Sequence, residues 1–354
     1  MRNLSSIKQV ALIGGAFLLL GAGCGAAKQV APDGGVFKSF DGGETWRPSN
    51  AIPTVAGVRS FSTANVLSLV ADPTHTGTVY AGTATDGLFV SYTGGSDWRR
   101  LGDAESVRAL AIDSTAPCTL FASVGNRVIK SNDCGRVWSA AFDVAKPTQE
   151  VRALALAPDN HKRLYIGLSD GVFLVSNDAG ESGSVVYRFN ALIRKIVPDP
   201  KNPARVYIVT EGKGLWRSND GGNTWDELRE PLRTFAGNQT GWDLSIDPKN
   251  SQRLMYASPY GLLRSENGGD SWAPIPLITA PGEARIYAVA INPEASQEIF
   301  YSAVVGGKSL LYKTVDGGAN WRTKKLPTMR IPTTIHIRSD KPLEVFIGTY
   351  LQQK

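Results

Sequence analysis

Short apolar runs alternate with turn-forming residues along most of the chain. Runs such as VLSLVA (66–71) and LSI (244–246) stop at Asp-Pro, a second run such as TVYAG (78–82) follows, and a third such as GLFVS (87–91) comes after a short polar turn. Runs of this length, bounded by Gly, Pro, Asp and Asn, predict β-strands rather than helices. Because they are mostly apolar and do not alternate strictly, we expect sheets that are buried on both faces.

Each third run leads into an eight-residue segment of one pattern, with Ser or Thr first, Asp usually third, Gly fifth and Trp usually last. The seven segments begin at Ser39, Ser91, Ser131, Ser176, Ser218, Ser265 and Thr314, and are 40 to 52 residues apart. This period suits four short strands with their turns, which is one blade of a propeller. The sequence therefore predicts an all-β, seven-bladed β-propeller of four-stranded antiparallel blades.

The third-position aspartates are explained by turn chemistry. They are Asp41, Asp133, Asp178, Asp220 and Asp316. We expect each carboxylate to accept backbone N–H groups of its own turn, as a structural and not a catalytic group. Thr93 and Asn267 stand in place of Asp, and Gly183 stands in place of Trp. We expect those three turns to be looser.

The two ends of the chain each supply half a blade. Residues 35–48 contain only a third strand, one of the eight-residue segments (called boxes below) and a fourth strand, whereas residues 334–350 contain only a first and a second strand. We expect these segments to pair and close the ring, because closure removes exposed sheet edges. The propeller is therefore predicted to span residues 35–354.

The N-terminus indicates export. Arg2 and Lys8 precede an apolar run, Val10 to Leu20, which is too short for a confident membrane span. Gly21-Ala22-Gly23-Cys24 resembles the lipobox of bacterial lipoproteins, although Gly21 stands where Leu is usual. The resemblance implies a signal peptide at 1–23, a lipid on Cys24, a tether over 24–34 and attachment to the outer side of a bacterial membrane. An ordinary secretory signal with a chance cysteine is the alternative.

Charge, cysteines and histidines limit the kinds of ligand and site that we expect. The formal net charge of +6 is too small to indicate nucleic-acid binding. If residues 119–123 and 127–131 pair across a Gly125-Asn126 turn, Val124 faces Arg127 and Cys118 comes within one residue of Cys134. These cysteines could form a disulfide or remain unbonded. The three histidines are isolated, so we expect no metal site and no cofactor.

A candidate binding site emerges when the first strands are aligned on their Asp-Pro ends. The equivalent positions are Leu67, Arg108, Arg152, Arg194, Trp242, Tyr287 and Thr333. Three consecutive blades thus place arginine at one rim of the channel, and the next two place aromatic residues there. Guanidinium groups suit carboxylate or phosphate recognition, and Trp and Tyr suit stacking. Alternatively, the arginines are structural and pair with acidic neighbours such as Glu105 and Asp243.

The boxes resemble the Asp-box, or BNR, repeats of bacterial-neuraminidase-type propellers. Seven boxes in one propeller of this length most resemble the photosystem II stability/assembly factor family, whose members are non-enzymatic and bear an arginine-rich patch. That resemblance implies a protein-binding or assembly module acting through the channel-mouth face. We expect its partner to be an unidentified protein or a glycan.

Two hydrolase families with similar boxes give the alternative. Sialidases use three arginines and a Tyr activated by Glu, roles for which this chain offers its rim arginines with Tyr287 and Glu283. Xyloglucanase-type enzymes use a cleft between two propellers with one catalytic carboxylate from each, so one propeller supplies half of that machinery. The alternative function is therefore a glycoside hydrolase of sialidase type, or a glycan-binding protein, using the same face.

Overall fold

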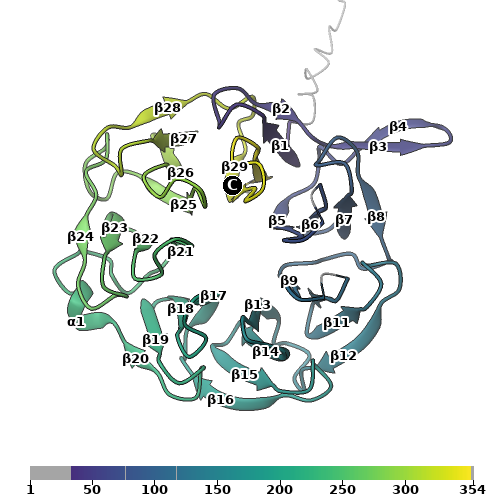
Figure 1. Ribbon diagram of the computed structural model, residues 1–354, viewed down its shortest axis with the longest axis horizontal. Coiled ribbons are helices and arrows are strands. Elements are labelled where there is room, and N and C mark those ends of the chain that lie inside the picture. Colours follow the sequence, from purple (N-terminus) through teal and green to yellow (C-terminus); the bar gives the residue numbers. More distant parts are fainter. Residues whose placement is uncertain (1–32, 76, 117, 352–354) are drawn as a thin grey trace, which may run out of the picture. The chain divides into compact units, whose positions relative to one another are not determined.

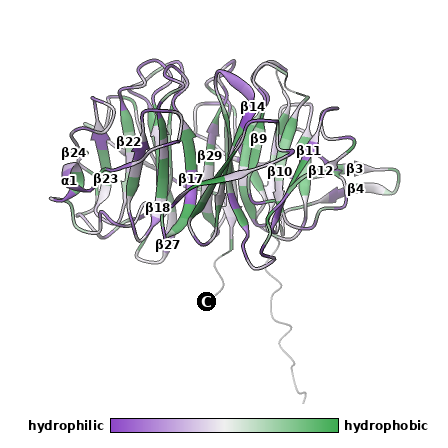
Figure 2. Cartoon of the chain, turned by 90° about the horizontal axis from the view of Figure 1, so that it is seen from below, coloured by the Kyte–Doolittle hydropathy of each residue, from purple (hydrophilic) through white to green (hydrophobic). Residues whose placement is uncertain are grey.

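A computed structural model describes residues 33–351, apart from 76 and 117, and shows seven four-stranded antiparallel sheets around a central opening (Figure 1). The predicted fold is thus confirmed. In each blade the first strand lies innermost and the fourth lies at the circumference. Seen from the side, the apolar strands stand roughly side by side and polar residues gather in the turns (Figure 2).

The blades are built from successive strands in chain order. The first has β5 (Val66–Ala71), β6 (Val79–Thr83), β7 (Leu88–Ser91) and β8 (Arg99–Leu101). The second has β9 (Leu110–Ile112), β10 (Leu120–Val124), β11 (Arg127–Ser131) and β12 (Ser139–Asp143). The third has β13 (Val151–Ala157), β14 (Asn160–Leu168), β15 (Val172–Ser176) and β16 (Ser184–Arg188). The fourth has β17 (Leu192–Pro198), β18 (Val206–Glu211), β19 (Leu215–Ser218) and β20 (Asp226–Glu227). The fifth has β21 (Asp243–Ile246), β22 (Leu254–Ser258), β23 (Gly261–Ser265) and β24 (Ala273–Pro274), and the sixth has β25 (Arg285–Ile291), β26 (Ile299–Val305), β27 (Lys308–Thr314) and β28 (Arg322–Lys324).

The seventh blade joins the two ends of the chain. Its strand order is β2-β1-β30-β29, made of β29 (Ile331–Ile337) and β30 (Val345–Tyr350) from one end and β1 (Val36–Ser39) and β2 (Arg47–Pro48) from the other. Val36 pairs with Gly348 and Ser39 pairs with Val345. This is the predicted closure, although the innermost strand begins three residues before the expected position 334.

The Asp boxes form the turns between third and fourth strands. As predicted, the third-position side chain accepts from its own turn; the Thr45 amide donates to Asp41 Oδ1 at 2.8 Å. The Thr314 hydroxyl and the Asn320 amide, which donate to Asp316, lower the pKa of that carboxyl to about 2. Gly43 and its six counterparts all have positive φ, as a tight turn of this kind requires.

First-position hydroxyls complete the box turns, a contact that the sequence analysis missed. In all seven boxes the fifth-position glycine donates its backbone N–H to this hydroxyl. At two of the three boxes expected to be looser, the third-position side chain keeps a backbone contact of the turn. Asn267 Oδ1 and Thr93 Oγ1 accept the same backbone N–H that a carboxylate would, at 2.9 and 3.1 Å, because each side chain presents an oxygen at the same place.

Two long connections carry added elements. A hairpin of β3 (Ala51–Thr54) and β4 (Gly57–Ser60) projects outward from the ring between the seventh and first blades (Figure 1). The short helix α1 (Arg229–Leu232) lies between the fourth and fifth blades and buries Leu232. In the second blade Val124 faces Arg127 as predicted, and Cys118 and Cys134 are joined in a disulfide with their Cα atoms 3.9 Å apart.

The predicted signal peptide, Cys24 and nearly all of the tether lie outside the described residues. Within the described part of the chain, no helix has the length and apolar character that crossing a membrane requires.

Candidate functional site

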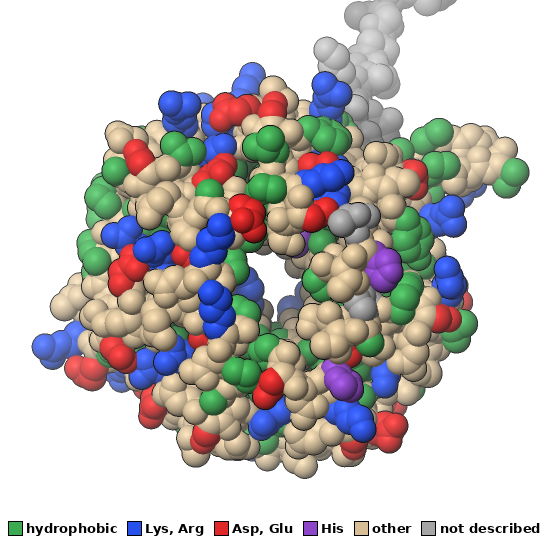
Figure 3. Space-filling view, in the orientation of Figure 1, with side chains coloured by type: hydrophobic (Ala, Val, Ile, Leu, Met, Phe, Trp, Pro, Cys, Tyr) green, Lys and Arg blue, Asp and Glu red, His purple; other side chains and the backbone are tan. Residues whose placement is uncertain are grey.

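The seven aligned positions meet in one central pocket of about 310 Å³. Its walls include Leu67, Arg108, Arg152, Arg194, Trp242, Tyr287 and Thr333, together with neighbouring residues of the innermost strands. Figure 3 shows that the centre of the ring remains open when all atoms are drawn. The sequence alignment of the blades thus located the residues that share the channel.

β-bulges expose most of these side chains. The register of the innermost strand slips at Leu67, Arg152, Arg194, Tyr287 and Thr333. A bulged residue leaves the regular pairing and its side chain is redirected. Arg108 and Trp242 lie just before β9 and β21, where the strand has not yet begun. Each blade therefore turns one side chain toward the opening.

Two glutamates, Glu150 just before β13 and Glu211 at the end of β18, form ion pairs with the three arginines. Glu150 lies between two of them, with its Oε2 atom 3.5 Å from Arg108 Nε and 2.9 Å from Arg152 Nη2. Glu211 binds Arg194 at 2.6 Å. Burial lowers the pKa of the Arg152 guanidinium below its usual value, and the positive charge of Arg108 lowers it further. The expected partner Glu105 forms no ion pair within the described chain, and Asp243 binds Lys195 instead, at 2.6 Å.

A fourth arginine joins the aromatic side, and sequence alignment missed it. The Arg285 guanidinium lies 4.7 Å from the Trp242 ring centre and 5.4 Å from the Tyr287 ring centre. Arg194 also lies over Trp242, at 4.8 Å, and the two aromatic rings are 6.4 Å apart. Arg285 opens β25 two residues before Tyr287, so an alignment of single positions could not find it. We call the following set the rim cluster: Arg108, Glu150, Arg152, Arg194, Glu211, Trp242, Arg285 and Tyr287.

A sialidase-type site is not assembled. Glu283 Oε2 accepts the Ala280 backbone N–H in its own exposed turn, 3.1 Å away, and Glu283 is not among the residues that line the pocket. The residue that would activate Tyr287 is therefore engaged elsewhere. Glu283 and Tyr287 are close in sequence, but the turn at 280–283 directs the Glu283 side chain to a backbone N–H of that turn.

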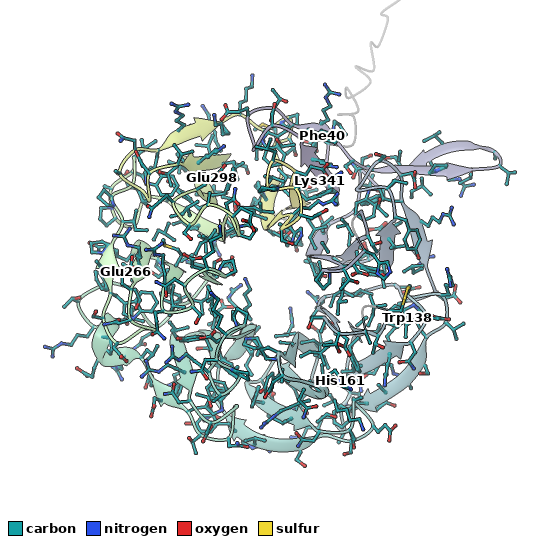
Figure 4. The ribbon with its side chains drawn as sticks, in the orientation of Figure 1. Phe40, Trp138, His161, Glu266, Glu298 and Lys341 are labelled. Atoms are coloured by element: carbon teal, nitrogen blue, oxygen red, sulfur yellow. A yellow bond between two sulfur atoms is a disulfide. The ribbon has the colours of Figure 1, made fainter. Side chains whose placement is uncertain are left out.

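Carboxylates in the box and strand turns, away from the opening, also have structural partners. Figure 4 labels Glu266 and Glu298, which lie over the blades and not over the opening. Glu298 binds Lys313 at 2.7 Å, and Glu266 binds Arg253 at 3.0 Å. These contacts stabilise turns and leave the rim cluster as the place where charged and aromatic side chains converge.

Fold and site together define an Asp-box seven-bladed propeller with a basic, aromatic channel mouth. A family model described as "Photosynthesis system II assembly factor YCF48" matches residues 189–324, which confirms the resemblance to that family. A structure of YCF48 bound to D1 peptide has a TM-score of 0.61 at 16% identity, covering 86% of this chain and 95% of that one.

The curated relatives are xyloglucanases. Xyloglucanase Xgh74A of Acetivibrio thermocellus is 26% identical over 163 residues, which make up 37% of this chain and 19% of that enzyme. The GH74 xyloglucanase structure from Xanthomonas campestris has a TM-score of 0.66 at 19% identity and is matched over 81% of this chain and 51% of its own. This chain thus spans about a fifth of the curated enzyme and about half of the solved one, and the structural likenesses show the fold alone.

These relatives overturn the predicted function. We expected a non-enzymatic protein-binding or assembly module, but the curated proteins that match are enzymes named for xyloglucan. The error has a physical cause, because the boxes that suggested an assembly factor are turn structures that a hydrolase propeller needs equally. The number of boxes describes the scaffold and does not separate a binding protein from an enzyme.

Proposed function

We propose that this chain is a carbohydrate-active propeller that binds a polysaccharide at the rim cluster. The observation that carries the proposal is the pair Trp242 and Tyr287, half-buried side by side at the pocket among four arginines. A sugar ring presents an apolar face that stacks on aromatic rings, and hydroxyls that hydrogen-bond to planar charged side chains. The xyloglucanase relatives support a glycan over other ligands of the same face.

Polysaccharide hydrolysis is the second candidate, favoured by the enzyme names of the relatives. Glycoside hydrolysis uses two carboxyl groups on either side of the scissile bond. Glu150 and Glu211 are the carboxylates of the rim cluster, and both lie close enough to Arg152 to raise the pKa of its guanidinium. We assign them as the pair to test.

Binding is tested by electrophoresis of the purified chain through gels containing xyloglucan, mixed-linkage β-glucan or acidic polysaccharides. W242A should lose about 2 kcal/mol of binding free energy, roughly a 30-fold weaker Kd, as expected for a central aromatic contact. Y92A is the matched control, because Tyr92 is an exposed aromatic residue in a box turn. No retardation by any polysaccharide, or equal loss in both variants, would reject the proposal.

Hydrolysis is tested separately by release of reducing ends from the same polysaccharides. We expect E150Q and E211Q each to abolish turnover, because either substitution removes one of the two carboxyl groups. Turnover that survives both substitutions would exclude this pair. Retardation without turnover in the unmodified chain would leave a binding function and remove the hydrolytic one.

We also propose that the chain is exported and anchored through a lipid on Cys24. Metabolic labelling with a radioactive fatty acid should mark the protein, and C24S should abolish the label. Unchanged labelling of C24S would disprove the anchor.

A further inference from the structure

The rim cluster contains more positive than negative charge. Four arginines face two glutamates, and Glu150 is already shared by Arg108 and Arg152. Within the chain as described, Arg285 has no carboxylate at ion-pair distance, and its contacts are the rings of Trp242 and Tyr287. Lys195 and Asp243, which also line the pocket, neutralise each other. Two positive charges at the mouth are therefore left without a counterion from the part of the chain that the structure describes.

The arginines also keep hydrogen-bond donors available. Arg194 and Arg285 lie over the Trp242 ring, and the side-chain hydrogen bonds of the described chain include one from Arg194 Nη2 to Glu211 and none from Arg285. The Nε atoms of Arg152 and Arg194 are shielded from solvent and have no hydrogen-bond partner among the described residues. A guanidinium with free in-plane donors matches the two oxygens of a carboxylate.

Repulsion among the arginines indicates the sign of the ligand. Arg108 and Arg194 both lower the pKa of Arg152, in addition to the effect of burial. An anion placed between these side chains would relieve the repulsion, whereas a neutral ligand would only displace water from them.

We propose that the rim cluster binds a polysaccharide that carries carboxylates, with uronic acid units, in preference to a neutral one. The aromatic pair supplies the surface for the sugar ring, and the arginines supply the partners for its carboxylate. This inference rests on the proposed glycan-binding function and names the class of glycan.

The test compares two polymers with one backbone. The full chain is titrated with polygalacturonate and with its fully methyl-esterified form, which lacks the negative charge, and binding is followed by calorimetry. Dextran sulfate controls for charge alone, and xyloglucan represents neutral glucans. We expect polygalacturonate to bind on the order of ten-fold more tightly than its ester at low salt, and the difference to shrink as ionic strength rises.

Variants locate the effect. R285A and R152A should each remove most of the preference for the acidic polymer, whereas R99A should retain it, since Arg99 is an exposed arginine on the outermost strand of the first blade. Circular dichroism of each variant verifies the fold.

The possible outcomes separate this inference from the proposed function. Equal binding of the acid and the ester, or tighter binding of xyloglucan, would overturn the inference and leave glycan binding intact. Dextran sulfate binding as tightly as polygalacturonate would show attraction by charge alone and also overturn it. A preference that survives R285A and R152A would place the site elsewhere. No binding to any polymer would reject both proposals.

Discussion

Replacing Phe346 with alanine tests whether the seam between the chain ends stabilises the ring. Phe346 lies in β30, pairs with Lys38 of β1 and is fully buried. Its ring packs in a cluster with Val36 from the N-terminal half of the same blade and Phe89 from the first blade. One side chain thus joins both chain ends to the neighbouring sheet.

The size of the effect follows from this burial. Truncating a fully buried Phe costs about 3–5 kcal/mol through lost transfer free energy and the cavity left behind. Native domains have about 5–15 kcal/mol of unfolding free energy in total, so F346A should remove a large part of it. The control F40A truncates a Phe of the same blade that is 52% exposed, and should change stability by no more than about 0.5 kcal/mol.

Urea unfolding followed by tryptophan fluorescence provides the measurement. Trp98 is fully buried in the same cluster and responds to opening of the seam. F346A should shift the midpoint strongly downward and F40A should not. A loss under about 1 kcal/mol in F346A would mean that β30 is not packed as described, and the reasoning about closure would be wrong.

Three further predictions concern individual groups. Reduction of the Cys118–Cys134 disulfide should cost about 3 kcal/mol, because it frees a loop with a sequence separation of 16 residues, and unchanged urea midpoints with and without dithiothreitol would contradict this. Asp316 has a pKa of about 2 in the fold against 3.8 ordinarily, so it stabilises the fold above pH 3.8, and this contribution is lost as pH falls toward 2. D316N places at this position the residue type that the sixth box has naturally, and should weaken the loss of stability in acid. An unchanged dependence of stability on pH would refute the role of the Asp316 carboxylate. Burial lowers the pKa of His336 to about 4, and the charge of Arg338 acts in the same direction. The contribution of the neutral ring to stability is therefore complete above pH 6.5 and is lost as pH falls from 6.5 to 4. An NMR titration of its ring protons with a midpoint near 6.5 would disprove this.

Local regularities explain why much of the fold and part of the site could be predicted. Each Asp box closes through hydrogen bonds spanning two to four residues, so its pattern is visible in any eight-residue window. The rim positions could be aligned because every innermost strand ends at an equivalent Asp-Pro or similar turn. The Val124–Arg127 register followed from one tight turn.

Contacts between blades could not be predicted in the same way. Glu150, which precedes the first strand of the third blade, pairs with Arg108 of the second blade, and Arg285 reaches Trp242 across the boundary between two blades. Glu283, which sequence proximity placed near Tyr287, is held in its own turn. The function was misjudged for a related reason, since the repeated pattern describes the scaffold and carries little information about what the channel mouth binds.

The amino-acid sequence by itself determined the number of blades, the ring closure and the positions that reach the channel, because these depend on short-range turn chemistry repeated seven times. Only the tertiary structure decided which charges pair at the rim and which arginine joins the aromatic residues. Those outcomes depend on the distances between side chains from different strands and blades, which the pairing of the strands and the packing of the blades around the ring set.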